Sequence, residues 1–338
     1  MDKLLRSNVS RLLKKLSEHA EIYAPTMEDG VCVLSKLVNN YDDWTLDYVR
    51  TTNSVKDIFF PQNEEIMRYK NANNDLNIEP PKPFKERVAF GVRPCDAAAM
   101  LLLDNVFLEG EFYDSYYKER REKGALITIA CEKPDQYCFC TSFHSSPGAT
   151  EGSDIVLYPA DDYFLVVAVT DKGKKLIKAN AEIFENATEK SGIVENYKSM
   201  KTPIGNNCSP GELNEKLKNE FDNPYWKKIA RRCLGCGNCT FVCPTCHCFA
   251  VCDVARGCDG KRTRTWDSCK FQDFFLMAGD HNPRPTQVER TRQRFMHKLN
   301  YFKEKYDKYQ CVGCGRCVEK CPVGVHIADV ITHMKEEL

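Results

Sequence analysis

The sequence predicts an α+β chain with three parts: a mixed α/β domain over residues 1–200, a linker over 201–223, and a helical domain over 224–338. In the first 200 residues, apolar runs typical of buried strands alternate with helical patterns, which is the order of a layered α/β domain. Residues 189–222 are polar and contain Gly, Asn, Ser and Pro, as linkers do. Residues 224–338 hold 13 of the 19 cysteines.

The individual elements follow from apolar periodicity. Leu12, Leu13 and Leu16 share one helical face and predict a helix over residues 8–19. The same reasoning predicts a short helix at 212–221 and a strong one over 286–306, within an insert that we expect to be largely helical. Strands are expected over 21–23, 31–34, 87–92, 125–131 and 163–169, with helices over 97–106 and 172–184. Periodicity does not assign the strand order.

Composition indicates the compartment. The N-terminus has no apolar signal-peptide core, and no apolar run approaches the roughly 18 residues needed to span a bilayer. We therefore expect a cytosolic protein without membrane partners, in which thiols stay reduced. In such a protein, 19 cysteines indicate metal ligands rather than disulfides.

Charge is balanced over the whole chain but not along it. Residues 226–321 carry 19 Lys and Arg against 9 Asp and Glu. A basic stretch can bind nucleic acid, but it can also offset negatively charged metal clusters or attract an acidic redox partner. We favour the second explanation, and we expect Arg262, Arg264 and Arg316 to compensate cluster charge.

Two cysteine runs near the C-terminus carry the strongest signal. Each has the spacing Cys-x2-Cys-x2-Cys-x3-Cys-Pro, beginning at Cys233 and at Cys311. This is the ferredoxin-type pattern for a [4Fe–4S] cluster, in which the fourth cysteine of one run ligates the other cluster. A zinc ribbon uses two Cys-x2-Cys pairs and fits this pattern poorly. Cluster A would take Cys233, Cys236, Cys239 and Cys321, and cluster B would take Cys311, Cys314, Cys317 and Cys243.

Sixty-seven residues separate the two runs, far more than a compact bacterial ferredoxin uses. The spacing resembles the α-helical ferredoxin domains of respiratory iron–sulfur subunits. We therefore expect the C-terminal domain to be of the α-helical ferredoxin type.

Four N-terminal cysteines form a weaker candidate for a third cluster. They are Cys95, which follows one predicted strand, Cys131, which ends another, and Cys138 and Cys140 in the loop that comes next. Spacing alone leaves three possibilities open: a cluster, a zinc site, or buried free thiols that pack as small apolar groups.

The remaining cysteines exceed the four that each cluster needs. Cys246, Cys248 and Cys269 are expected to pack beside the clusters, with a further metal site or a redox-active thiol pair as the alternative. Cys32 and Cys208 have no nearby partners, and Cys252 and Cys258 have no assigned role. His247, His281 and His297 are expected outside the cluster ligands, because complete cysteine sets are available.

Several motifs in order resemble one family. They are Pro94-Cys95-Asp96, Tyr137-Cys138-Phe139-Cys140, Pro224-x-Trp226, Cys243-Pro244-Thr245-Cys246-x-Cys248, Trp266-Asp267-Ser268-Cys269 and the run Cys311–Cys317. The chain resembles the β subunit of cytosolic sulfhydrogenases, which are NAD(P)-linked nickel–iron hydrogenases, and is similar, less closely, to the A subunit of anaerobic sulfite reductase. One stretch departs from the family pattern, at Asp280 and Pro283.

The resemblance implies three [4Fe–4S] clusters, the third on Cys95, Cys131, Cys138 and Cys140. It also implies a non-catalytic electron-transfer subunit of an anaerobic complex, beside an FAD-containing, NAD(P)H-oxidising subunit and a terminal catalytic subunit, most nearly a hydrogenase. No glycine-rich nucleotide loop follows a strand, so we expect flavin and NAD(P)H on a partner. The alternatives are the A subunit of a sirohaem sulfite reductase, a flavin-based electron-bifurcating complex, and a nucleic-acid-associated iron–sulfur protein. An enzyme with an open cluster iron is disfavoured, because each predicted cluster has its fourth cysteine.

Overall fold

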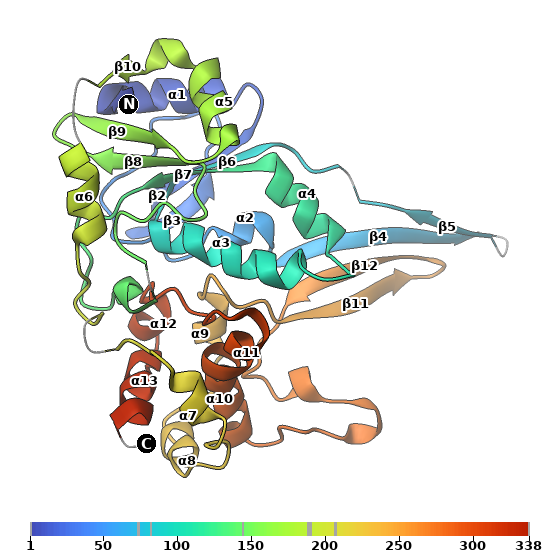
Figure 1. Cartoon of the computed structure of the whole chain (residues 1–338). Helices are drawn as coiled ribbons and strands as arrows, with labels where there is room; N and C mark the ends of the chain where they lie inside the picture. The colour runs from blue at the N-terminus through green and yellow to red at the C-terminus, as the bar shows by residue number, and fades with distance from the viewer. Residues whose placement is uncertain are drawn as a thin grey trace.

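A computed structural model describes residues 2–72, 75–81, 83–143, 145–187, 191–205 and 208–336 (Figure 1). The described chain combines helices and strands, as the α+β prediction required. Among these residues, no helix is both long and apolar enough to cross a bilayer.

The N-terminal domain is built on an eight-stranded sheet in the order β10-β1-β9-β8-β7-β6-β2-β3. The central neighbours β2, β6, β7 and β8 run parallel, and the other pairs are antiparallel. Every residue of β7 is buried, which explains its continuous apolar sequence. The strands are β1 (Asp2–Leu5), β2 (Glu21–Glu28), β3 (Val31–Lys36), β6 (Arg87–Val92), β7 (Gly124–Ile129), β8 (Ile155–Pro159), β9 (Tyr163–Ala168) and β10 (Glu185–Asn186).

Helices cover both faces of this sheet. On one face, α1 (Val9–Leu16) and α5 (Asp171–Ala179) pack on the strands through an apolar cluster that includes Leu12 and Leu13. On the other face lie α2 (Lys56–Phe59), α3 (Pro94–Phe107), α4 (Ser115–Lys123) and α6 (Ser191–Ser199). Short 3-10 turns span Arg6–Asn8, Cys140–Phe143 and Ala181–Ile183.

The carboxyl ends of two parallel strands carry candidate ligands. Strand β6 ends at Val92 and leads into α3, which begins at Pro94 rather than at 97, because proline is favoured in the first helical turn. Cys95 therefore lies in the first turn of α3. Strand β7 ends at Ile129, two residues before Cys131. Since β6 and β7 are adjacent and parallel, the chain leaves both strands at one edge of the sheet.

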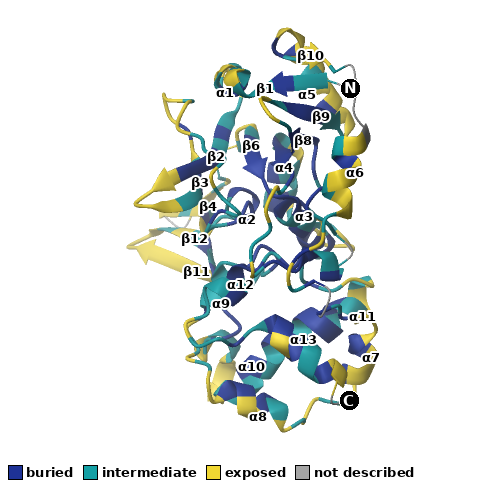
Figure 2. Ribbon diagram, turned by 90° about the vertical axis from the view of Figure 1, so that its left-hand side faces the viewer, coloured by how far each residue is buried: buried dark blue, intermediate teal, exposed yellow. Residues whose placement is uncertain are grey.

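A second, four-stranded sheet projects from the body as an arm, in the order β11-β12-β4-β5 (Figure 1). Its strands are β4 (Asn63–Ala72), β5 (Asp75–Glu79), β11 (Phe249–Arg256) and β12 (Asp259–Trp266). The hairpin β11–β12 lies between the two cysteine runs, so the expectation of a largely helical insert is wrong for residues 249–266. Strand β11 is exposed along most of its length and lacks the apolar alternation that marks a half-buried strand (Figure 2). Its partner β12 pairs with β4 of the N-terminal domain, a contact that local sequence does not encode.

The rest of the C-terminal domain consists mainly of helices. The predicted helix over 286–306 is present as one continuous run, with a π-helical turn at its centre. Leu213 and Leu217 from the expected linker are buried in the same core as Trp226 and Phe295, so this segment is part of the folded domain. The helices are α7 (Leu213–Leu217), α8 (Tyr225–Ala230), α9 (Asn238–Phe241), α10 (Gln287–Met296), the π turn (His297–Tyr301), α11 (Phe302–Tyr306), α12 (Arg316–Glu319) and α13 (Ile327–Glu336), with 3-10 turns at Asp273–Phe275 and Ala278–Asp280.

The two domains share a buried contact. Ala99 and Leu102 of α3 pack against Phe302 and Val312 of the C-terminal domain. This contact brings the second cysteine run against the N-terminal cysteines.

Candidate iron–sulfur sites

The four cysteines of the expected cluster A line one small cavity, which we call site A. Cys233, Cys236 and Cys239 come from the loop after α8 and the start of α9, and Cys321 comes from the loop after α12. The loop closes tightly because Gly237 adopts a positive φ of 75°, and a β-carbon there would meet the ring of Phe271 at 2.7 Å.

Site B is formed by the second run together with Cys243. Burial raises the pKa of the Cys317 thiol to about 12, and the nearby thiols Cys243, Cys314 and Cys239 act in the same direction. Cys311 likewise interacts with Cys317 and Cys243. The structure therefore brings together the four side chains expected for cluster B.

Site N is a second small cavity, lined by all four N-terminal candidates, Cys95, Cys131, Cys138 and Cys140. Cys314 of site B lines the same cavity. The loops that hold the two sites touch, because the backbone N–H of Phe139 donates to the carbonyl oxygen of Gly313 at 2.9 Å. A β-carbon on Gly313 would meet that segment at 2.2 Å, so the approach requires glycine.

The three sites lie in series. Sites A and B meet where the thiols of Cys239 and Cys317 interact, and sites B and N meet where Cys314 interacts with Cys95 and Cys140. The interactions among these thiols link site A with site B and site B with site N. The order along the molecule is therefore A, B, N.

Four buried cations surround sites A and B without carboxylate partners. Lys56, Lys270, Arg294 and Lys298 are each at most 3% exposed, and none forms an ion pair with Asp or Glu of the described chain. Lys298 Nζ lies 3.4 Å from Cys243 Sγ and donates to Thr245 Oγ1 at 2.9 Å. Arg294 Nε and Nη2 are buried and have no hydrogen-bond partner among the described residues.

Buried cations without a charged partner are strongly destabilising, and burial lowers the pKa of Lys56 and of Lys270, so nearby negative charge would stabilise this arrangement. Burial by itself lowers the pKa of Lys298, but its thiol neighbours Cys243, Cys246 and Cys311 outweigh burial and raise it. A four-thiolate cluster carries about two negative charges when oxidised, so two clusters would match the four cations. The donor set and its surroundings thus fit iron–sulfur clusters at sites A and B.

Two of the arginines expected to compensate cluster charge have other partners. Arg262 forms an ion pair with Asp253 on the exposed arm, at 2.8 Å, and Arg264 is bound by Glu64 and Asp114. The expectation for these two is wrong, because they serve the second sheet. Arg316 is buried between sites B and N, near Cys314 and Cys95, but it is already paired with Asp96 at 2.6 Å.

The four buried cations were missed by sequence reasoning. Arg294 and Lys298 fall within the predicted helix over 286–306, four residues apart and therefore on one face. Their position next to buried Phe295 and Leu299 is the one local signal that could have indicated burial. Lys56 comes from the other domain and has no signal near the cysteine runs.

The geometry bears on the zinc alternative. Within the described ranges, no group of three or more His, Cys, Asp or Glu side chains is placed to hold a single metal ion. A cubane is larger than one ion and holds its four thiolates farther apart. The thiols lining sites A and N are arranged around a cavity, in keeping with a cluster.

The supernumerary thiols lie beside the sites. Cys246 contacts Cys243 of site B, and the Cys248 thiol contacts that of Cys269, which in turn interacts with Cys239 of site A. Cys252 and Cys258 are exposed on the arm, away from these groups. Cys208 is buried, and Cys32 is half-buried.

His247 and His297 are half-buried in the C-terminal domain. Burial lowers the pKa of His247 to about 4 and that of His297 to about 3, so both are neutral near pH 7. His247 is held by Gln310, whose Nε2 lies 2.9 Å from its Nδ1. His281 is exposed.

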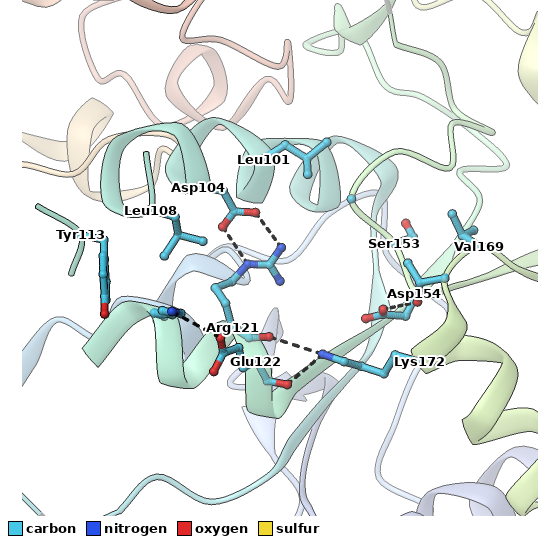
Figure 3. A pocket seen from close by; sticks show the side chains of 13 residues that line it. Leu101, Asp104, Leu108, Tyr113, Arg121, Glu122, Ser153, Asp154, Val169 and Lys172 are labelled. Atoms are coloured by element: carbon cyan, nitrogen blue, oxygen red, sulfur yellow. Dashed lines mark hydrogen bonds and ion pairs between the residues drawn. The ribbon is translucent and has the colours of Figure 1, made fainter. Parts of the chain in front are cut away.

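A hollow of about 440 Å³ lies on the N-terminal domain, lined by residues of α3 and α4 and by the segment before α5 (Figure 3). Its charged groups already have internal partners. Asp104 accepts from Arg121 at 2.9 Å, and Lys172 Nζ donates to backbone carbonyl oxygens, including that of Gly124 at 2.6 Å. These groups fix the packing of α4 on the sheet.

Comparison with known proteins places this arrangement in a family. The profile of a family described as "4Fe-4S dicluster domain" matches residues 232–325, which contain both cysteine runs. The chain is 35% identical over 329 residues to sulfhydrogenase 2 subunit beta of Pyrococcus furiosus, a match that covers 96% of this chain and 95% of the relative. No solved structure matches. Because this identity extends over nearly the full length of both chains, the protein belongs to the sulfhydrogenase β-subunit family.

Proposed function

We propose that sites A, B and N each hold one [4Fe–4S] cluster and that the chain relays electrons in a cytosolic, hydrogenase-like complex. It would connect an FAD-containing, NAD(P)H-oxidising subunit with a terminal catalytic subunit of the hydrogenase type. Family membership and the dicluster domain support the role of an iron–sulfur electron-transfer subunit.

The serial arrangement of the three cysteine groups carries this proposal. Electron transfer needs redox centres at short separations, and here adjacent sites share interacting thiols. Each cluster, when bound, would take up and release one electron.

The protein's own residues set the conditions for this relay. Lys270, Arg294 and Lys298 place positive charge beside sites A and B and so favour the more negative, reduced state. At site N, Arg50 has one Nη1–H directed at Cys138 Sγ at 3.4 Å, while Asp135 and Glu319 hold its guanidinium. Cys138 and Cys140 are buried, which shields their site from water.

The basic surplus of residues 226–321 has a partly internal explanation. Six of its Lys and Arg side chains are buried, namely Arg264, Lys270, Arg290, Arg294, Lys298 and Arg316. These side chains cannot contact nucleic acid, so the surplus does not favour a nucleic-acid-binding role.

The test is anaerobic purification of the native complex through a tag on this chain, with iron, acid-labile sulfide and flavin measured per subunit. About twelve iron atoms per copy, after subtraction of partner clusters, are expected for three cubanes. A co-purifying flavoprotein and a nickel–iron subunit would support the relay. About eight iron atoms would indicate that site N holds no cluster and is not part of the relay. A sirohaem protein in place of the hydrogenase would indicate that the terminal reaction is sulfite reduction.

A further inference from the structure

We propose that the protein surface beside site A is the docking surface for an acidic one-electron carrier protein of the ferredoxin class. This inference rests on the proposed function, because it requires a cluster at site A. It adds an entry point for electrons that is separate from a permanent flavin subunit. We call this surface the port; it consists of Lys227, Lys228, Arg231, Arg232, Leu234, Cys236 and Pro322.

The port lies at the outer end of the series of sites. Helix α8, which leads into the first cysteine run, is at the end of the molecule far from the eight-stranded sheet in both views (Figures 1 and 2). Of the twelve proposed ligands, Cys236 alone is exposed. Leu234 beside it is 66% exposed, and Pro322 is also exposed. A carrier docked here would meet site A without any protein layer between them.

The charge of the port is positive and not neutralised. Lys227, Lys228, Arg231 and Arg232 are all exposed, and none pairs with a carboxylate of the described chain. Arg232 is fixed in place, because its Nη2 donates to the carbonyl oxygens of Val323 and Gly324 at 2.9 and 3.0 Å. These carbonyls belong to the loop that carries Cys321, so the positive charge is tied to the ligand loop itself.

A comparison with the arm indicates the kind of partner. The arm exposes Leu76, Ile78, Val251 and Val254 on its two edge strands, and permanent interfaces are built from such apolar surface. The port instead has four unpaired cations around one leucine. Small, charged surfaces are typical of brief redox encounters, in which charge complementarity directs the approach. The complementary partner is a protein with acidic residues around its own redox centre.

Docking would allow a single outer-sphere step. One electron leaves the reduced carrier and enters site A, which lowers the charge of that site by one unit; no bond is made or broken, and no proton is transferred. Reversal of the charge on the port should therefore change the rate of encounter and leave the cluster itself intact.

The test measures the reduction of the cluster-loaded native complex by a reduced, acidic bacterial [4Fe–4S] ferredoxin in a stopped-flow instrument. The variant is Lys227→Glu/Lys228→Glu/Arg231→Glu, whose side chains form no hydrogen bond or ion pair with the described residues. The matched control is Lys174→Glu/Lys175→Glu/Lys178→Glu on α5, which changes the net charge equally at exposed positions of the other domain. Reduced methyl viologen, a small cation, serves as the second probe.

At low ionic strength we expect the rate constant with ferredoxin to fall by about 10-fold or more in the port variant, and to lose most of its salt dependence. The α5 control should keep a rate within about 3-fold of the wild type. Viologen should reduce all three proteins, with unchanged iron content.

Equal rates in the port variant and the α5 control would overturn the docking proposal, while reduction by viologen would show that the clusters and the proposed relay stand. Failure of viologen to reduce the chain would instead count against the relay itself. If another subunit covers the port in the intact complex, so that ferredoxin cannot reach it, the surface would be assigned to that permanent subunit. Inhibition by a short DNA duplex at physiological salt would assign it to nucleic acid. Either of these last two results would also overturn the proposal.

Discussion

Sites A and B differ from site N in how their buried cations are balanced. Around A and B, four buried Lys and Arg side chains have no carboxylate partner. Around N, Arg316 pairs with Asp96, and Arg50 pairs with Asp135 and Glu319. Buried Arg93 also lines site N, where it donates to backbone carbonyl oxygens and forms no ion pair with a described carboxylate. The cations around A and B therefore depend on negative charge from thiolate-bound clusters, whereas two of the three arginines at site N have carboxylate partners. The difference teaches that the C-terminal core depends more strongly on its cofactors than the contact between the domains does.

Removal of the clusters should have the largest effect, and it should destabilise the C-terminal domain more than the N-terminal sheet. An unpaired buried cation costs several kcal/mol, and four of them approach the roughly 5–15 kcal/mol of stability that a domain has. After anaerobic chelation of iron, we expect hydrogen exchange to accelerate in α10 and α12, while β6, β7 and β8 stay protected. Equal loss of protection in both regions would show that the comparison is mistaken.

The buried pair between the domains offers the next largest effect. Asp96→Asn leaves the Arg316 guanidinium without its carboxylate, and we expect a loss of about 3–5 kcal/mol in the free energy of unfolding, measured by chemical denaturation. Arg262→Met serves as the control, because its pair with Asp253 is exposed and should contribute little to stability. A loss of less than 1 kcal/mol in Asp96→Asn would mean that the junction does not depend on this pair.

Replacement of Lys298 tests how one buried positive charge affects the reduction potential of a single cluster, the one at site B. Lys298→Met removes a positive charge 3.4 Å from Cys243 Sγ, so the reduced state of the cluster at site B loses stabilisation. We expect its reduction potential to fall by about 50–100 mV, with the potential at site N nearly unchanged. Redox titration followed by electron paramagnetic resonance measures both. The Lys303→Met variant, at a half-buried position paired with Asp307, should leave both potentials unchanged.

The smallest effect is expected at the thiols of the arm. Cys252→Ser and Cys258→Ser alter exposed side chains that are far from the sites, and the free energy of unfolding should change by less than about 0.5 kcal/mol with full iron content. Cys239→Ser is the contrasting variant, since it removes a proposed ligand of site A and should release up to about four iron atoms per chain. Loss of iron from the Cys252→Ser variant would require a revised ligand set.

Sequence reasoning reached much of the architecture because the relevant signals are local. The fully buried strand β7 has a continuous apolar sequence, and the helix over 287–306 has a sustained apolar stripe. The hairpin β11–β12 was missed because its residues are mostly exposed and its partner strand β4 lies about 190 residues away in the chain. Arg264 was misjudged for the same reason, since its partner Glu64 arrives with that strand.

The sequence by itself determined the two cysteine runs, because ligand spacing within a tight loop is a local property of the chain. It also determined the family, through motifs spread over most of its length. Only the tertiary structure decided the order A, B, N, since this order depends on the packing of Val312 and Phe302 against α3. The tertiary structure likewise decided which cations face the thiols. Lys56 reaches Cys246 from the other domain, and the energy of a buried charge depends on the groups around it, which residue order alone does not specify.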